Sequence, residues 1–182
     1  MRRGILFIAA VVAVLSVVSV GSVLASEGGG RRGDDESHDR DKTATILEFE
    51  TMVGVPPGLT GSTNPIRGIS GGGLPWVIRD AEGELDTGGH LEIKVKGLVL
   101  DPNDPTVIGL GRAGVNPASS FKAIVSCLGS DGVTHNVATD AFAANPAGDS
   151  KIEQTIVLPQ PCIAPIVFVT SAGGAWFAAT GF

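Results

Sequence analysis

The sequence predicts an all-β domain: an antiparallel β-sandwich, immunoglobulin-like or jelly-roll-like, with eight or nine short strands and one disulfide. Apolar and polar residues alternate over short runs, a pattern typical of strands that bury one face. The chain has 26 glycines and 11 prolines among its 182 residues, and they separate these runs at the spacing of turns. Beyond residue 25, no run of helical periodicity exceeds two turns, which favours a sandwich or barrel.

The first 25 residues have the pattern of a secretory signal peptide. Two arginines precede an apolar stretch from Ile5 to Val20, and Val23 and Ala25 fit the −3 and −1 positions of a cleavage site. An uncleaved anchor is the alternative, because the apolar run approaches the roughly 20 residues that span a bilayer. We expect cleavage after Ala25 and a protein that is secreted or held at the cell envelope.

The charge of the chain disfavours two classes of partner. Without residues 1–25 the protein has 157 residues, with eleven basic and nineteen acidic side chains and a net charge of −8. Nucleic acid requires clustered lysines and arginines, which are missing, and anionic lipid repels an acidic surface. We therefore expect no nucleic acid and no stable membrane span after cleavage. The partner is then an extracellular or envelope ligand that the sequence does not identify.

Residues 26–43 are predicted to be a disordered charged linker, since three successive glycines and a charged run supply few apolar groups. The linker contains Arg32-Gly33-Asp34, the tripeptide of integrin ligands, which arises easily by chance in such a composition. A single β-sandwich domain is predicted over residues 44–182.

Three strands are predicted in the first half of this domain. Residues 44–51 alternate apolar and acidic side chains, residues 74–79 form a short apolar run, and residues 90–96 show the clearest alternation. Between them, residues 53–73 lose periodicity and are rich in Gly and Pro, which predicts a long surface loop. Residues 80–89 are predicted to be a turn region.

The second half begins with a strand over residues 121–127, in which alternate residues are apolar. Residues 129–132 have hairpin composition, so residues 133–142 should return antiparallel. Another strand follows over residues 152–158. Two apolar strands end the chain, joined by a hairpin at residues 171–174.

Cys127 and Cys162 are the only cysteines, and in an exported chain they are predicted to form a disulfide. Two free buried thiols are the alternative. The bond would close a 35-residue loop and stabilise the fold by about 3.5–4 kcal/mol. We expect it to join the strand at residues 121–128 to the one at 152–158, with Cα atoms about 4.4–6.8 Å apart.

Asp101, Asn103 and Asp104 are candidate calcium ligands, because extracellular loops with several oxygen donors bind this ion. Two neighbouring prolines make a rigid turn the alternative. His90 and His135 together with a carboxylate are a candidate mononuclear metal site, with surface histidines as the alternative. No other cofactor is predicted.

Two patterns could support catalysis. Four closely spaced acids could pair as general acid and base, although their composition favours a solvated charged loop: Asp80, Glu82, Glu84 and Asp86. Ser70 lies in a G-x-S-x-G sequence but lacks the preceding strand and following helix of a nucleophile elbow. Neither pattern predicts an enzyme.

Trp76 and Trp176 are candidate binding residues, since flat aromatic rings form the platforms of carbohydrate-binding modules. Both lie in predicted strands, which favours packing in the core over binding.

A stretch beginning at Phe49 and running through Val53-Gly54-Val55-Pro56-Pro57, followed by Leu91 to Leu98, resembles the opening of CHRD domains. The resemblance covers about a third of the chain and implies a secreted β-rich module. The histidine-containing signature of that family is absent from this chain, and its two cysteines are additional to the family pattern.

These observations favour an exported, non-catalytic module with a binding or structural role at the cell envelope or outside the cell. One alternative is a small secreted hydrolase that uses loop carboxylates. Another is a surface-assembly subunit that pairs through its C-terminal strand, in which case the chain assembles with copies of itself.

Overall fold

A computed structural model describes residues 43–181, so the predicted signal peptide and all but the last residue of the predicted linker lie outside the described residues. The described part is all-β, as predicted. Eight of its strands have four or more residues and four have only two. The helical segments are a 3₁₀ turn at Pro57–Leu59 and one turn of α-helix, α1, at Pro105–Gly109. None of the described helices is long and apolar enough to cross a membrane.

One sheet contains four antiparallel strands in the order β1-β4-β5-β10. Their bounds are Thr45–Phe49, Asp80–Asp86, His90–Lys96 and Ser150–Thr155. The inward-facing residues of these strands are apolar and include Leu85, Leu91, Ile93 and Ile152, none of which is exposed. The register shifts at Ile46, which interrupts the apolar and acidic alternation of the first strand.

The second sheet has the strand order β2-β12-β11-β7-β8. Their bounds are Val53–Gly54, Trp176–Ala179, Ile163–Thr170, Ser120–Leu128 and Thr134–Ala138. A further two-residue strand, β9 (Phe142–Ala143), pairs with the start of β7. β3 (Trp76–Val77) and β6 (Val99–Leu100) form a small separate ladder.

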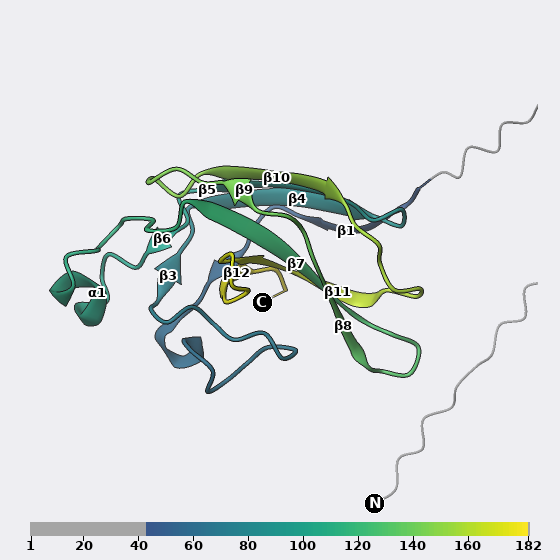
Figure 1. Cartoon of the computed structure of the whole chain (residues 1–182), viewed down its shortest axis with the longest axis horizontal. Coiled ribbons are helices and arrows are strands. Elements are labelled where there is room, and N and C mark those ends of the chain that lie inside the picture. Colours follow the sequence, from purple (N-terminus) through teal and green to yellow (C-terminus); the bar gives the residue numbers. More distant parts are fainter. Residues whose placement is uncertain (1–42, 182) are drawn as a thin grey trace, which may run out of the picture. The chain divides into compact units, whose positions relative to one another are not determined.

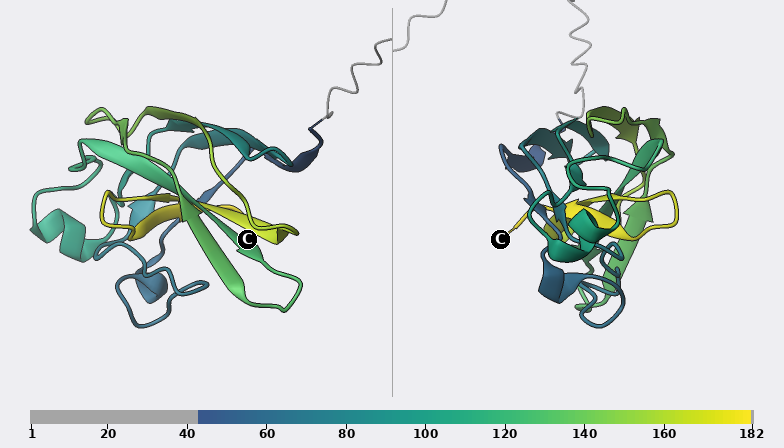
Figure 2. Two further views of the ribbon diagram at one scale, coloured as in Figure 1. Left: turned by 45° about the vertical axis from the view of Figure 1, so that its right-hand side comes forward. Right: turned by 90° about the vertical axis from the view of Figure 1, so that its left-hand side faces the viewer.

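The two sheets lie one over the other, with the four-stranded sheet above β11 and β12 in Figure 1 and in both views of Figure 2. Phe121, Ala123, Val125 and Cys127 share one face of β7, and none is exposed, which confirms the predicted face. The ring of Phe177 packs edge-on against Phe121, with 6.0 Å between centroids. The core therefore fills the space between the two sheets, as in a sandwich.

The predicted disulfide between Cys127 and Cys162 is present, and its Cα atoms are 4.9 Å apart. The predicted pairing of strands was wrong in one respect. Cys162 immediately precedes β11, which pairs with β7, so the bond joins neighbours within one sheet. β10 already ends at Thr155, and residues 156–162 pass from the four-stranded sheet to the other. A formed disulfide is typical of proteins outside the reducing cytoplasm.

The predicted turn at residues 80–89 was also wrong, because Asp80–Asp86 is the seven-residue strand β4. Its inward positions are Ala81, Gly83 and Leu85, and two of these are too small to give a clear apolar signal. Despite this weak apolar signal, residues 80–86 form a strand because they pair with β1 on one side and β5 on the other. The strand predicted at residues 74–79, by contrast, is longer than the one observed, because only the two residues of β3 form a strand there.

The Gly- and Pro-rich stretch at residues 55–75, which we call the covering loop, packs on the outer side of the six-stranded sheet. Gly71 forms a parallel bridge with Trp176, and the Gly72 N–H donates to the Trp176 carbonyl at 2.8 Å. Gly71 is required there, because a Cβ at this position would lie 2.1 Å from the Leu59 carbonyl oxygen. The loop is thus docked edge-on against β12.

Further along, the covering loop reaches β7 and β8. Arg67 Nη1 donates to the Ser126 carbonyl at 2.8 Å, and Asn136 Nδ2 donates to the Arg67 carbonyl at 3.0 Å. Ser126 lies on the face of β7 opposite the main core and is nevertheless fully buried. The outer face of this sheet is therefore closed to solvent around Ser126.

Candidate functional site

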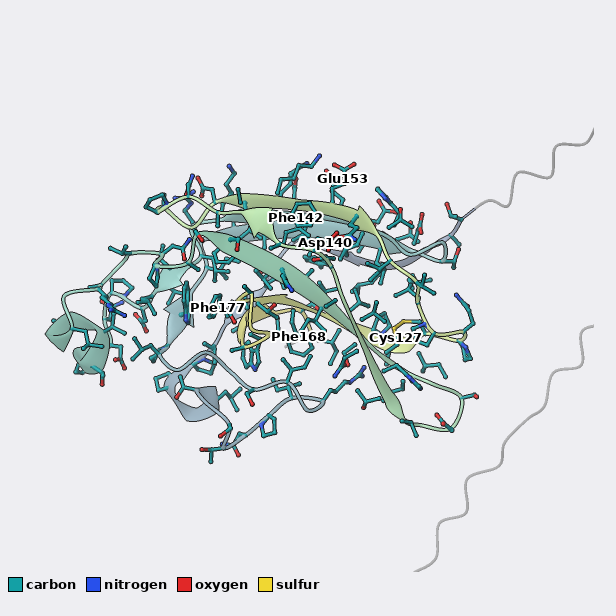
Figure 3. All side chains as sticks on the ribbon, viewed as in Figure 1. Cys127, Asp140, Phe142, Glu153, Phe168 and Phe177 are labelled. Atoms are coloured by element: carbon teal, nitrogen blue, oxygen red, sulfur yellow. A yellow bond between two sulfur atoms is a disulfide. The ribbon has the colours of Figure 1, made fainter. Side chains whose placement is uncertain are left out.

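Four glutamates form a continuous row across the four-stranded sheet. Glu48 in β1 lies opposite Glu84 in β4, Glu84 lies opposite Glu92 in β5, and Glu92 lies opposite Glu153 in β10. Residues directly opposite on neighbouring strands share a face, so the whole row lies on the outer side of the sheet. Figure 3 shows Glu153 pointing away from the body of the domain. We call this set the glutamate row.

Such an arrangement opposes folding unless positive charge offsets it. Cβ atoms of directly opposite residues are about 4.5–5.5 Å apart, and like charges at this spacing are destabilising. Each interior member of the row, Glu84 and Glu92, has a glutamate on both sides. The row therefore attracts cations, whether from the protein itself or from a ligand.

Lysines of the same sheet offset one half of the row. Lys151 Nζ lies 2.6 Å from Glu153 and 3.3 Å from Glu92, and one step along the sheet Lys94 Nζ lies 2.7 Å from Glu82. Hydrogen bonds from Lys151 lower the pKa of Glu153, and bonds to Glu153 and Glu92 raise the pKa of Lys151. Lys94 lowers the pKa of Glu82 in the same way.

The other half of the row has no such partner within the described residues. Neither Glu48 nor Glu84 takes part in an ion pair between residues 43 and 181. Glu84 accepts a hydrogen bond from the Thr45 hydroxyl, and nearby Asp86 accepts one from the His90 backbone N–H at 2.9 Å. These neutral donors leave the negative charge of this half in place.

A shallow groove of about 340 Å³ lies over this charged region. Its lining comes from β1, β4, β5 and the residue after β1: Glu48, Phe49, Glu50, Glu82, Gly83, Glu84, Asp86, His90, Glu92 and Lys94. The ring of Phe49 lies where a side chain on Gly83 would be, since a Cβ there would approach the ring to 2.5 Å. Because Gly83 is an inward position and Phe49 lies directly opposite it, the ring packs against the core, and the outer surface of the groove presents six carboxylates.

The candidate calcium ligands have structural roles in the turn before α1. Asp101 Oδ1 accepts a hydrogen bond from the Asn103 backbone N–H at 2.8 Å. Asp104 Oδ1 accepts from the N–H groups of Thr106 and Val107 at 2.9 and 3.0 Å, and so caps α1. Both carboxylates therefore stabilise the local backbone of this turn.

His90 and His135 do not form a common site, because His90 is in β5 and His135 is in β8 of the other sheet. Instead, His90 lies beside Glu92 and Glu153. The ligand atoms of these three residues are all within 4.8 Å of one another, the only such group of His, Cys, Asp and Glu in residues 43–181.

The prediction that Trp76 and Trp176 are binding platforms is corrected by their burial. Trp76 is 5% exposed and Trp176 is not exposed. Trp76 stacks on Phe177 at 3.9 Å, and Trp176 packs edge-on against Phe168 at 6.1 Å. Their faces are used by the core, where large aromatic side chains gain most from burial.

Of the residues considered for catalysis, the four acids are placed differently from the prediction, whereas Ser70 lies in a loop as predicted. The four acids of residues 80–86 lie on strand β4 rather than on a loop, and they project from the outer face with the glutamate row. Ser70 lies in the part of the covering loop that docks on β12, with its carbonyl accepting from the Trp176 N–H at 2.9 Å, and no helix follows it. The geometry of a nucleophile elbow is therefore missing.

The C-terminal strand β12 is paired on both sides, with β11 and with β2. A neighbouring chain could pair with it only if β2 were displaced.

In comparison with known proteins, no family model, no curated protein and no solved structure matches this chain.

Proposed function

We propose that this protein is an exported, non-catalytic β-sandwich module that binds a basic segment of a partner protein. The binding surface is the outer face of the four-stranded sheet. The observation that carries the proposal is the glutamate row, of which one half lacks a cationic partner among the described residues. Export is supported by the signal-like sequence of residues 1–25 and by the disulfide.

The groove over β1, β4 and β5 suits lysine and arginine side chains in particular. Their charged groups reach Glu48 and Glu84, while their alkyl chains lie along the outer surface of the sheet.

Strand β1 offers a means of holding an extended segment. Within the described residues it pairs with β4 alone, so its other edge is open to a further strand. Addition of a partner strand at such an edge supplies backbone hydrogen bonds, and side chains then give specificity. Alternate lysines of the added strand would face Glu48.

The test compares a lysine-rich peptide with a glutamate-rich peptide of equal length by isothermal titration calorimetry. We expect binding of the lysine-rich peptide alone, and weakening when sodium chloride is raised from about 0.05 to 0.5 M, because salt screens exposed charges. The double variant Glu48→Gln and Glu84→Gln should weaken binding by up to about fivefold per charge removed.

Asp131→Asn is the matched control. It removes one negative charge in the β7–β8 turn, on the other sheet, and keeps the side-chain oxygen that accepts from the Val133 N–H. Peptide affinity should not change in this variant. Equal weakening in both proteins would mean that net charge rather than the groove attracts the peptide, and the proposal would be wrong.

A further inference from the structure

A second feature of the same sheet points to a metal ion. His90 and Glu92 are two apart on β5 and therefore lie on the same face, and Glu153 is the direct cross-strand neighbour of Glu92. A rigid antiparallel register thus brings an imidazole and two carboxylates to one place. Their ligand atoms lie within 4.8 Å of one another.

These distances are close to those of a metal centre. Zinc binds histidine nitrogen and carboxylate oxygen at about 2.0–2.2 Å, so two ligands of a tetrahedral ion are about 3.4 Å apart. All three side chains are at least partly exposed, so small rotations can close the remaining gap. Three protein ligands leave one position for water or for a ligand group, as in open zinc sites.

The carboxylates of Glu92 and Glu153 both form ion pairs with the ammonium group of Lys151. Lys151 Nζ lies 2.6 Å from Glu153 Oε2 and 3.3 Å from Glu92 Oε1. An exposed ion pair of this kind is weak, and the side chain of Lys151 is 54% exposed, so it is free to turn into solvent. The ammonium group therefore acts as a competitor that a divalent ion can displace.

The mixed donor set selects among metals. Calcium prefers six to eight oxygen ligands and gains nothing from an imidazole, whereas imidazole suits zinc and similar transition metals. We propose that His90, Glu92 and Glu153 form a zinc-type divalent metal site, with Lys151 as the built-in competing cation. This inference goes beyond the binding of a basic segment, because it uses the other half of the glutamate row.

The test titrates zinc into the purified protein against a chromophoric chelator, after removal of metal. We expect one ion per chain at this site. Both His90→Gln and Glu153→Gln should weaken zinc binding at least about tenfold, since each removes one of three ligands. Lys151→Met should strengthen it by up to about fivefold, because it removes an exposed competing charge.

His135→Gln is the matched control in the described part, and His38→Gln controls for residues outside it. Neither should alter the affinity of the site. Calcium in place of zinc should show no difference between the wild-type protein and His90→Gln. Circular dichroism without metal confirms that each variant is folded.

Three outcomes would overturn the proposal. The first is equal zinc binding in His90→Gln and His135→Gln, the second is weaker binding in Lys151→Met, and the third is no saturable binding in either the wild type or Lys151→Met. The basic-peptide titration, repeated with EDTA, separates the two proposals. Loss of zinc binding with peptide binding intact rejects the metal site alone.

Discussion

The outer faces of the two sheets differ: one is covered by a loop, and the other carries a row of charged side chains. The outer face of the six-stranded sheet lies under the covering loop, which contacts β12, β7 and β8 and leaves Ser126 fully buried. The outer face of the four-stranded sheet carries the glutamate row and a charged groove. We call them the covered face and the open face.

The two faces differ in what they contribute to stability. A covered face satisfies backbone groups and buries apolar surface, so substitutions there should cost stability. On the open face, like charges are placed next to one another at some expense of stability. In the proposed function, a ligand supplies the missing positive charge on this face.

The largest expected effect is loss of the disulfide at the end of the covered sheet. The double variant Cys127→Ala and Cys162→Ala should lower the free energy of unfolding by about 3–4 kcal/mol, because a 35-residue loop is released in the unfolded state. Urea denaturation of the variant and the oxidised wild type measures the difference. A loss below about 1 kcal/mol would show that the covering contacts, rather than the bond, hold this end together.

The next effect concerns the covering loop. Gly71→Ala should destabilise the domain by about 1–3 kcal/mol, since its new methyl group would lie 2.1 Å from the Leu59 carbonyl oxygen. Gly73→Ala is the matched control two residues away, because a Cβ there has no atom within 4 Å. Similar melting temperatures for the two variants would mean that the loop is not docked on β12 as described.

On the open face, by contrast, a substitution that removes a charge should increase the stability of the fold. Glu84→Gln removes a charge that lies between Glu48 and Glu92 and keeps an oxygen to accept from Thr45, so stability should rise by a few tenths of a kcal/mol, about the size of one cross-strand pair. The control Glu82→Gln removes an ion pair with Lys94 and should not stabilise. Thermal melts at low salt give the comparison. A lower melting temperature for Glu84→Gln than for Glu82→Gln would contradict the interpretation of the row.

The smallest effect is a pH dependence at the margin of the open face. The pKa of Asp149 is lowered below its usual 3.8, mainly by the hydrogen bond from the Gly97 N–H and then by the Asn145 side chain. A lowered folded-state pKa means that this stabilisation is complete above about pH 3.8 and is lost as the pH falls through the lower value. Asp149→Asn should therefore lose less stability than the wild type between pH 4 and pH 2. Parallel pH profiles in urea denaturation would contradict this assignment.

Local sequence patterns revealed some strands and their buried faces but missed others. Alternation within single runs gave the buried faces of β5 and β7, from Leu91, Ile93 and Val95 to Phe121 and Cys127. Strand β4 was missed, although its four acids at alternate positions were the available signal. Small inward residues hide an apolar periodicity from any local count.

The sequence by itself determined the all-β class, the hairpins at residues 129–132 and 171–174, and the cysteine pair, because these depend on local periodicity, on Gly and Pro, and on residue identity. Only the tertiary structure decided that Glu48, Glu84, Glu92 and Glu153 stand in one row, and that His90 meets two of them rather than His135. Strand order and register depend on loops, bulges and packing between distant segments. A single strand fixes which face a residue occupies, but not which residue lies opposite it.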